Sequence, residues 1–231
     1  MRRRVRTAYR RDMLIAEELL LVGTSPEGRN LLGSSRTLVL GGALLTELAL
    51  RERLDVDGRK RLRVLDGGTI GEPLLDEALV RFAEREGKKP KDALDRVGKK
   101  LQQPLLDSLV RRELVRPEPV KALGLTLTTR WPVLMSGPRD AVVGDLATVV
   151  TGAREPDSRT GALISLLHAV DALPKVLTTE MRPGMTNGEV KRRGKEISKK
   201  RWAPEAVATA GAELNTAMMA AVMAGGAASS S

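Results

Sequence analysis

The chain has 231 residues, 42% of them hydrophobic, which is enough to bury a sizeable core and argues against a disordered protein. It contains no cysteine and only 2% aromatic residues, which excludes disulfides, thiolate metal sites and a cysteine nucleophile and argues against base-stacking RNA-binding modules. A net charge of +10 indicates attraction to a polyanion, either nucleic acid or an anionic lipid surface.

The N-terminal segment is strongly basic. Six arginines crowd residues 1–11, which we expect to form a disordered basic arm. Asp12 is the expected N-cap of a helix that continues to about Leu21. We expect no signal peptide here, because Glu17 and Glu18 interrupt the apolar run and no small-residue cleavage site follows. No stretch reaches the roughly 20 apolar residues of a spanning helix. We therefore expect a soluble chain that at most sits on a membrane.

The next segments predict a central helix and a first hairpin. Residues 36–51 form a helical pattern that is apolar nearly all round, which is typical of a buried helix. Gly41 and Gly42 lower its helix propensity, so we expect them to permit close packing against another element. The segment 53–65 alternates apolar and polar residues around an Asp-Gly pair, which predicts a β-hairpin.

Prolines divide the middle of the chain. Helices are expected over 73–85, 90–103 and 104–113, each beginning with a proline. A second hairpin is predicted with arms at 114–116 and 123–128 around the loop PEPVKA. Further helices are expected at 138–151, 158–172, 187–201 and 203–224, before a flexible tail at 225–231. The predicted fold is mainly α-helical, a single domain over residues 12–224 with two β-hairpins.

Candidate catalytic residues are few. His168 and Asp171 lie one helical turn apart, and such a pair can serve in acid–base catalysis. His168, however, stands in the apolar stretch SLLHAV without a serine nucleophile motif or a second metal ligand, which favours a structural role. Asp76 and Glu77 are two carboxylates within one helical turn, and such a pair is usually part of a solvated helix face. We expect no enzyme activity, no cofactor and no metal site.

Two interpretations of the late basic helix stay open. The helix predicted at 187–201 is rich in lysine and arginine, and such a run is commonly a solvated surface. Alternatively it attaches the protein to an anionic leaflet, at about 1 kcal/mol per near-surface cation, with the arm at 1–11 adding to the attraction.

A nucleic-acid interpretation is the alternative function. The helix LLDSLVRREL followed by a basic hairpin is how a winged-helix DNA-binding module ends. The cations that would contact phosphates are Arg111, Arg112, Arg116 and Lys121.

Several leucine-rich segments in a fixed order resemble a known family. They are GALLTELALRERLDV at 42–56, GEPLLDEAL at 71–79, LVRPEPVKALGLTLTTRWP at 114–132 and SRTGALISLLHAVDAL at 158–173. Together they resemble the Golgi phosphoprotein 3 family of peripheral membrane proteins. The resemblance implies a mostly helical single domain, a basic pocket for phosphatidylinositol 4-phosphate, and a β-hairpin used in self-association and membrane contact.

The resemblance also assigns residues to the hairpin. Its position corresponds to residues 118–129, and Leu123, Leu125 and Leu127 become candidates for burial against a second protomer or in lipid. A homo-oligomer is therefore expected.

The pocket positions of the family carry different residues here. The Trp and Arg of eukaryotic members correspond to Leu32 and Gly41. The pair of pocket arginines corresponds to Lys99 and Gln102, of which only Lys99 is positive.

Two further cations, Arg36 and Lys100, lie nearby in the sequence, so the candidate head-group residues are Arg36, Lys99 and Lys100. Abundant Leu, Ala, Arg and Gly indicate a GC-rich bacterial source. The sequence thus predicts a cytoplasmic, non-enzymatic protein that binds anionic phospholipid or phosphoinositide surfaces peripherally.

Overall fold

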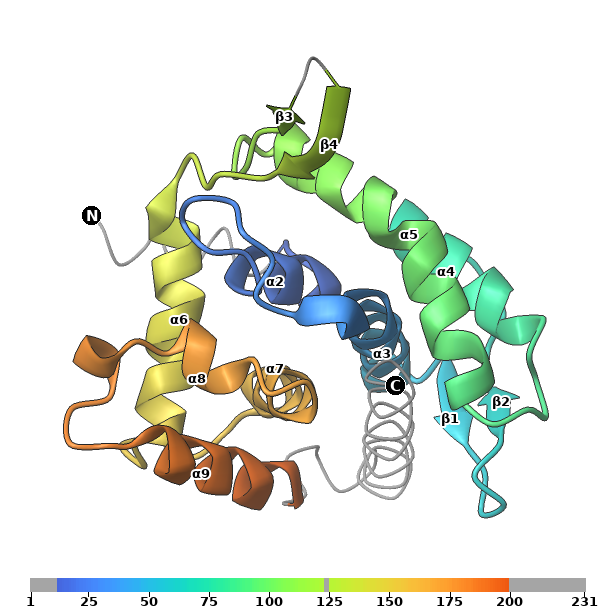
Figure 1. The fold of residues 1–231 in the computed structure, drawn as a ribbon. Coiled ribbons are helices and arrows are strands. Elements are labelled where there is room, and N and C mark those ends of the chain that lie inside the picture. The colour runs from blue at the N-terminus through green and yellow to red at the C-terminus, as the bar shows by residue number, and fades with distance from the viewer. Residues whose placement is uncertain (1–11, 123–124, 200–231) are drawn as a thin grey trace.

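The computed structural model describes residues 12–122 and 125–199, and the prediction of a mainly α-helical fold with two β-hairpins is confirmed within them. Two antiparallel two-stranded sheets accompany the helices (Figure 1). The predicted basic arm at 1–11, the last turn of the late basic helix, the helix at 203–224 and the tail at 225–231 lie outside the described residues.

Two buried helices occupy the centre. These are α2 (Ile15–Val22), every residue of which is buried, and α3 (Arg36–Leu50), which is buried from its third residue to its last but one. On one side they are covered by α4 (Pro73–Ala83) and α5 (Lys91–Arg111). On the other side lie α6 (Ser136–Val150), α7 (Ser158–Ala169), α8 (Leu173–Val176) and α9 (Asn187–Lys199). Short 3₁₀ turns at Gly33–Ser35 and Thr179–Met181 complete the fold.

Helices α3 and α5 touch through two glycines. A Cβ on Gly41 would lie 2.0 Å from the carbonyl oxygen of Leu94, and a Cβ on Gly98 would lie 1.7 Å from that of Thr37. No real side chain tolerates such distances, so both positions require glycine at this crossing. The close-packing role predicted for Gly41 is confirmed, and Gly98 is its counterpart on α5.

The predicted helix break at Pro104 is wrong, because α5 runs through it as a single helix of 21 residues. A proline inside a helix costs about 3 kcal/mol. Leu101, Leu105 and Leu109 continue one apolar face across it, and each is at most 2% exposed. Each such burial contributes about 1.5–3 kcal/mol, so the continuous face outweighs the lost hydrogen bond.

The N-cap predicted at Asp12 is also wrong, since helix α2 is capped at Leu14 by the side chain of Glu17. The Glu17 carboxylate accepts hydrogen bonds from the backbone N–H of Leu14 (2.8 Å) and from the Ser108 hydroxyl (2.5 Å). It also pairs with Arg112, which donates to the carbonyl of Asp12. A buried carboxylate needs several donors, and a helix N-terminus supplies them.

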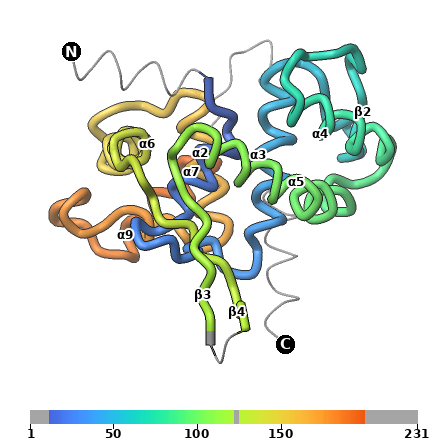
Figure 2. The backbone as a smooth tube through the Cα atoms, turned by 90° about the horizontal axis from the view of Figure 1, so that it is seen from above, coloured from blue at the N-terminus to red at the C-terminus, as the bar shows by residue number. Residues whose placement is uncertain are grey.

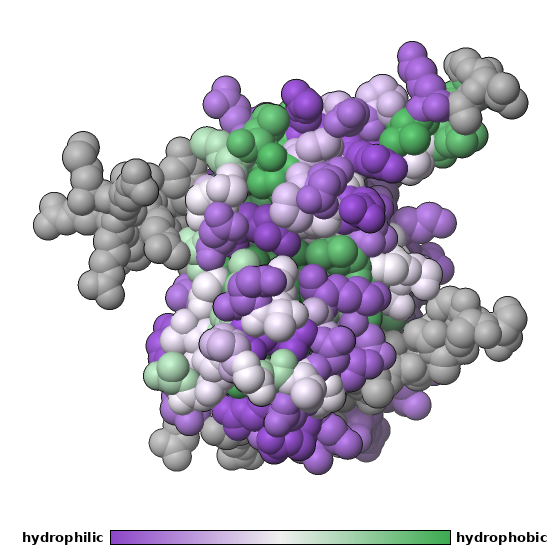
Figure 3. Space-filling view, turned by 60° about the vertical axis from the view of Figure 1, so that its left-hand side comes forward, coloured by the Kyte–Doolittle hydropathy of each residue, from purple (hydrophilic) through white to green (hydrophobic). Residues whose placement is uncertain are grey.

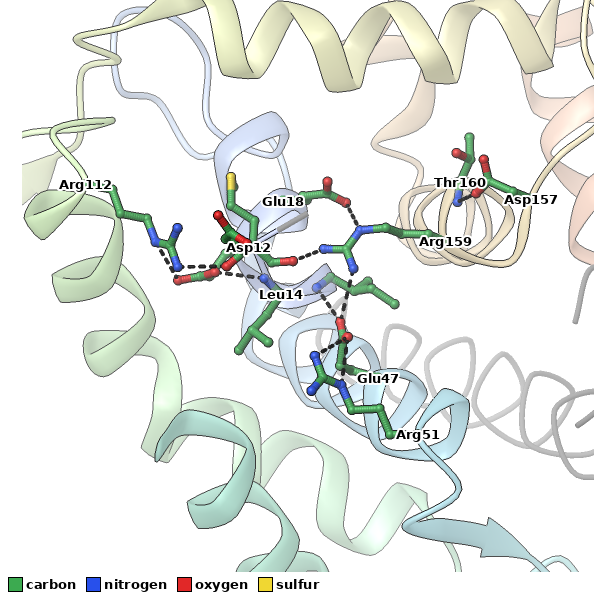
Figure 4. Close-up of polar contacts among 12 residues, drawn as sticks. Asp12, Leu14, Glu18, Glu47, Arg51, Arg112, Asp157, Arg159 and Thr160 are labelled. Carbon is green, nitrogen blue, oxygen red and sulfur yellow. Dashed lines mark hydrogen bonds and ion pairs between the residues drawn. The ribbon is translucent and has the colours of Figure 1, made fainter. Parts of the chain in front are cut away.

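A second set of buried charges joins α2, α3 and α7 (Figure 4). Arg159 donates to Glu18 (Nε to Oε2, 2.7 Å) and lies 3.6 Å from Glu47 (Nη1 to Oε2). Glu47 accepts from the backbone N–H of Ile15 (2.8 Å) and pairs with Arg51 (3.1 Å). Since each carboxylate is engaged by an arginine or a backbone N–H, the network ties the three helices together.

The first hairpin packs on the core. Strands β1 (Leu54–Val56) and β2 (Leu62–Val64) pair as predicted, and a five-residue loop that contains the Asp-Gly pair joins them. The Asp57 carboxylate accepts from the backbone N–H groups of Arg59 (2.9 Å) and Arg61 (2.8 Å), which stabilises this loop.

Candidate functional site

The second hairpin projects from the helical body (Figures 1 and 2). Its strands are β3 (Glu118–Ala122) and β4 (Leu125–Arg130), paired antiparallel. The predicted arm at 114–116 and the predicted PEPVKA tip are therefore wrong, because most of PEPVKA is strand β3 and the connection follows Ala122. Pro119 is tolerated because both strands of an isolated hairpin are edge strands.

Residues 114–116 form the stem of this hairpin. Leu114 and Val115 are buried, Val115 bridges to Val133, and the N–H of Arg116 donates to the carbonyl of Pro132 (3.2 Å). The stem thus belongs to the core, while the strands beyond it leave the body.

Strand β4 presents leucine to solvent. All six of its residues are exposed, with Leu125 at 71% and Leu127 at 68%. A register shift opposite Val120 and Lys121 leaves Leu127 without a cross-strand partner, which is a β-bulge. In Figure 3 apolar surface lies at this end of the molecule. The structure confirms that Leu125 and Leu127 lie on the hairpin, whereas Leu123 lies outside the described residues.

A loop after α2 clamps the base of the hairpin. The carbonyl of Gly28 accepts from the N–H of Trp131 (3.2 Å), and that of Pro26 accepts from Val133 (3.1 Å). Gly28 has φ +84°, and a Cβ there would lie 2.5 Å from the backbone nitrogen of Trp131. Only glycine fits, and the two hydrogen bonds fix the direction in which the hairpin leaves the body.

Arg139 holds this loop from the other side. Its side chain is buried, and its Nε donates to the carbonyl of Thr24 (3.1 Å), whose hydroxyl donates to Leu20 (2.7 Å). Burial lowers the pKa of Arg139, while Asp140 and Glu27 act in the opposite direction. Sequence reasoning missed this clamp, although the Ser-Pro-Glu-Gly run at 25–28 is a turn signal.

Three exposed cations lie on the hairpin and its stem. Arg116, Lys121 and Arg130 are exposed, and within residues 12–122 and 125–199 none of them makes an ion pair. Arg112, in contrast, turns inward to Glu17 and is not available to a phosphate. The surface therefore combines exposed leucine with free positive charge.

The candidate head-group residues lie elsewhere, on α3 and α5. Arg36 is the first residue of α3 and is half-buried, and this burial lowers the pKa of its guanidinium. It makes no hydrogen bond or ion pair with any described residue. Lys99 and Lys100 are exposed on α5. Because Thr37 and Gly98 touch at the helix crossing, Arg36 and Lys99 flank that point.

Around the crossing of α3 and α5, a carboxylate and buried apolar residues lie beside the cations. Asp95 accepts a hydrogen bond from the Thr37 hydroxyl and places a carboxylate beside Lys99. Leu32 is 2% exposed and packs over Gly23, and Gly41 faces the backbone of Leu94. Leu32 and Gly41 are therefore interior packing positions, and the positive charge lies on the surface.

Helix α9 carries the late basic cluster at the end of the molecule remote from the hairpin (Figures 1 and 3). Its apolar side packs inward. Much of its charge is neutralised locally, by the pairs Lys191–Asp171 (2.9 Å), Arg192–Glu196 (2.7 Å) and Arg193–Glu196 (2.9 Å). Lys195 and Lys199 are exposed without an ion pair to a described residue.

The only histidine packs between α7 and α9. His168 Nδ1 is buried without a hydrogen-bond partner in the described structure, and a Cβ on Gly194 would lie 3.2 Å from it. Burial lowers the pKa of His168; Asp171 opposes this shift, and Lys195 and Lys191 add to it. Asp171 is bound to Lys191 instead of orienting the imidazole, which supports a structural role for the histidine.

Asp76 fixes the loop before α4 and does not cap the helix, whose N-cap is Glu72 without a side-chain cap hydrogen bond. The Asp76 carboxylate accepts from the backbone N–H groups of Ile70 (2.6 Å) and Gly71 (3.2 Å), and Glu77 pairs with Arg81. Among the described residues, no group of three acidic or histidine side chains is placed to hold a metal ion. Likewise, none of the described helices is long and apolar enough to cross a membrane.

Comparison with known families gives one match. The model of the family described as Golgi phosphoprotein 3 (GPP34) matches residues 15–214, most of the chain. No curated protein matches the sequence. The chain therefore belongs to the Golgi phosphoprotein 3 family.

Proposed function

We propose that this member of the Golgi phosphoprotein 3 family is a cytoplasmic, non-enzymatic protein that binds anionic phospholipid surfaces peripherally and self-associates through the β3–β4 hairpin. The observation that carries the proposal is the pair of leucines on β4, Leu125 and Leu127, which are 71% and 68% exposed on a clamped, projecting hairpin. Exposed leucine at the tip of a rigid element has a physical use only if a partner or a lipid phase covers it.

The expected binding free energies are those of reversible attachment to a membrane. Burial of a leucine side chain contributes up to about 1.5–3 kcal/mol, and each cation near an anionic leaflet contributes about 1 kcal/mol. The hairpin and its stem also carry Arg116, Lys121 and Arg130. Apolar burial and electrostatic attraction therefore act at the same end of the molecule. Such attachment weakens with salt, because the electrostatic part is screened.

We assign further head-group contacts to Arg36, Lys99 and Lys100. Lysine binds phosphate as a point charge and lacks the fork of arginine. We therefore expect attraction to anionic head groups in general, with phosphatidylinositol 4-phosphate bound as one of them.

Self-association uses the same leucines. A hairpin has two edges with unpaired backbone groups, and β4 exposes threonine and leucine along its edge. In solution we expect a second copy to cover Leu125 and Leu127, whereas on a membrane the acyl region covers them.

The test is co-sedimentation with vesicles of neutral lipid, of anionic lipid, and of neutral lipid plus phosphatidylinositol 4-phosphate, at low and high salt. The variant Leu125→Ser/Leu127→Ser should lower the bound fraction on anionic vesicles. Its matched control is Leu65→Ser/Val80→Ser, which removes two exposed apolar side chains (46% and 58% exposed) away from the hairpin and should leave binding unchanged. Sedimentation velocity of both variants reports on self-association.

Equal losses in both variants would show that the hairpin is not the contact. Absent vesicle binding combined with tight DNA binding that needs Arg111, Arg116 and Lys121 would replace the proposal with the winged-helix-like alternative.

A further inference from the structure

Two segments distant in sequence meet at the tip of the first hairpin. The N–H of Leu62 donates to the carbonyl of Lys88 (2.9 Å), and the N–H of Gly87 donates back to Leu62 (2.8 Å). The Arg61 guanidinium donates to the carbonyl of Gly87 (2.7 Å). The β1–β2 loop and the turn before α5 therefore form one surface.

This surface concentrates positive charge. Its exposed cations, which we call the β1–β2 cation cluster, are Arg59, Lys60, Lys88, Lys89 and Lys91. None of these side chains makes a hydrogen bond or an ion pair with a described residue. Two carboxylates of these segments accept hydrogen bonds from backbone N–H groups, Asp57 within its own loop and Glu86 from Val64 (3.0 Å). Asp92 is the one further carboxylate in these two segments.

The cluster lies away from the β3–β4 hairpin. Lys91 begins α5, and the β3–β4 hairpin follows its other end. A helix of 21 residues is about 30 Å long. Figure 2 shows β2 and α4 on the far side of α5 from the β3–β4 hairpin. The two surfaces are therefore separate, and a contact made by one does not require the other.

The composition of the cluster restricts its partner. Between residues 57 and 63, and again between 87 and 91, no exposed side chain is apolar or aromatic. Protein partners are held mainly by buried Trp, Tyr and Arg anchors, of which the cluster has only Arg59, and single-stranded nucleic acid is held by stacking aromatics. What the surface offers is a cationic loop at the end of a short hairpin, flanked by lysines. Basic side chains of this kind reach the phosphates of double-stranded DNA, which carries one negative charge per about 1.7 Å of its axis.

We propose that the β1–β2 cation cluster binds the phosphate backbone of double-stranded DNA without sequence preference. Arg59 and Lys60 at the loop tip contact phosphates of one strand, while Lys88, Lys89 and Lys91 contact the phosphates beside them. Binding of this kind follows counterion release, with a slope of log K against log salt of about −0.9 per neutralised phosphate. This activity is independent of the hairpin leucines and of vesicle binding.

The test measures anisotropy of a labelled mixed-sequence DNA duplex between about 50 and 200 mM salt. The variant Lys60→Gln/Lys88→Gln/Lys89→Gln should weaken binding at least about tenfold and make the salt slope shallower by about 2.7. The matched control Lys175→Gln/Lys195→Gln/Lys199→Gln removes the same charge from exposed positions on α8 and α9 and should bind nearly as the unaltered chain.

Leu125→Ser/Leu127→Ser should keep full duplex binding, which separates this activity from membrane attachment. Equal weakening by the two triple variants would show an effect of net charge only and would overturn the proposal. So would tighter binding of a single strand than of the duplex. If the cluster variant instead lost anionic vesicles while keeping DNA, the partner would be a bilayer.

Discussion

The two hairpins have the same secondary structure and opposite surroundings. Strand β1 is buried throughout against the helices, whereas every residue of β4 is exposed. Their tips differ too, since the β1–β2 loop carries arginine and lysine and β4 begins with leucine. The comparison shows that apolar alternation predicts a hairpin but does not predict whether its apolar side chains are buried. Leucines are core residues in one hairpin and exposed to solvent in the other, because only the first packs against the helices.

The sharpest test of this contrast is a leucine deletion in each hairpin. Leu54 is 1% exposed and Leu125 is 71% exposed. Leu54→Ala should lower the free energy of unfolding by about 2–5 kcal/mol, because a buried cavity is left. Leu125→Ala should change it by less than about 0.5 kcal/mol. Urea denaturation of both variants checks this, and similar losses would mean that β4 is covered in the folded protein.

A glycine-to-alanine substitution at each hairpin should affect stability differently at the clamped base and at the open loop. Gly28→Ala should cost about 1–3 kcal/mol, because φ is +84° and the added Cβ meets the backbone of Trp131. Gly58→Ala is the control, since nothing lies within 4 Å of a Cβ there. Thermal unfolding compares the two. A neutral Gly28→Ala would refute the clamp.

Removing one cation from each hairpin should weaken the binding of a different ligand in each case. Arg130→Gln should weaken partition to anionic vesicles by about 1 kcal/mol at low salt, and the difference should vanish at high salt. Arg59→Gln should leave vesicle partition unchanged while lowering affinity for duplex DNA. Vesicle flotation and duplex titration measure both, and an Arg59 effect on vesicles would contradict the separation of the surfaces.

The smallest expected effect is a pH dependence that lies outside both hairpins. His168 is the only histidine, and burial lowers its pKa in the folded chain. The unfolded chain therefore binds more protons in mild acid, so the free energy of unfolding should fall as the pH drops below about 6.5. His168→Gln should flatten the pH dependence of the free energy of unfolding near that pH, as measured by urea denaturation at several pH values. An unchanged slope would contradict the burial of the imidazole.

The sequence predicted elements better than their boundaries. The buried helix at α3 and the tight packing at Gly41 follow from a run of apolar residues interrupted by glycine. The cap at Asp12 was wrong because Glu17 caps the helix locally at Leu14. The break at Pro104 was wrong because the buried leucines of α5 outweigh the local effect of proline. The second hairpin was predicted with its arms misplaced, since Pro119 suggested a turn but lies in an edge strand.

For the candidate site, alternation predicted the strand that carries Leu125 and Leu127, and the family resemblance marked these leucines as contact candidates. The clamp formed by Gly28, Thr24 and Arg139 was not predicted, since its members are joined across more than 100 residues. The β1–β2 cation cluster was missed for the same reason, as neither of its two segments is a long charge run by itself.

By itself the sequence determined the class of fold, the family, the excess of positive charge and the presence of alternating leucines in the second hairpin. These properties depend on composition and on periodicity within a few residues. The tertiary structure alone decided which hairpin is buried, which arginines are paired and where the free cations gather. Those outcomes depend on contacts between distant segments, and local patterns along one chain do not record them.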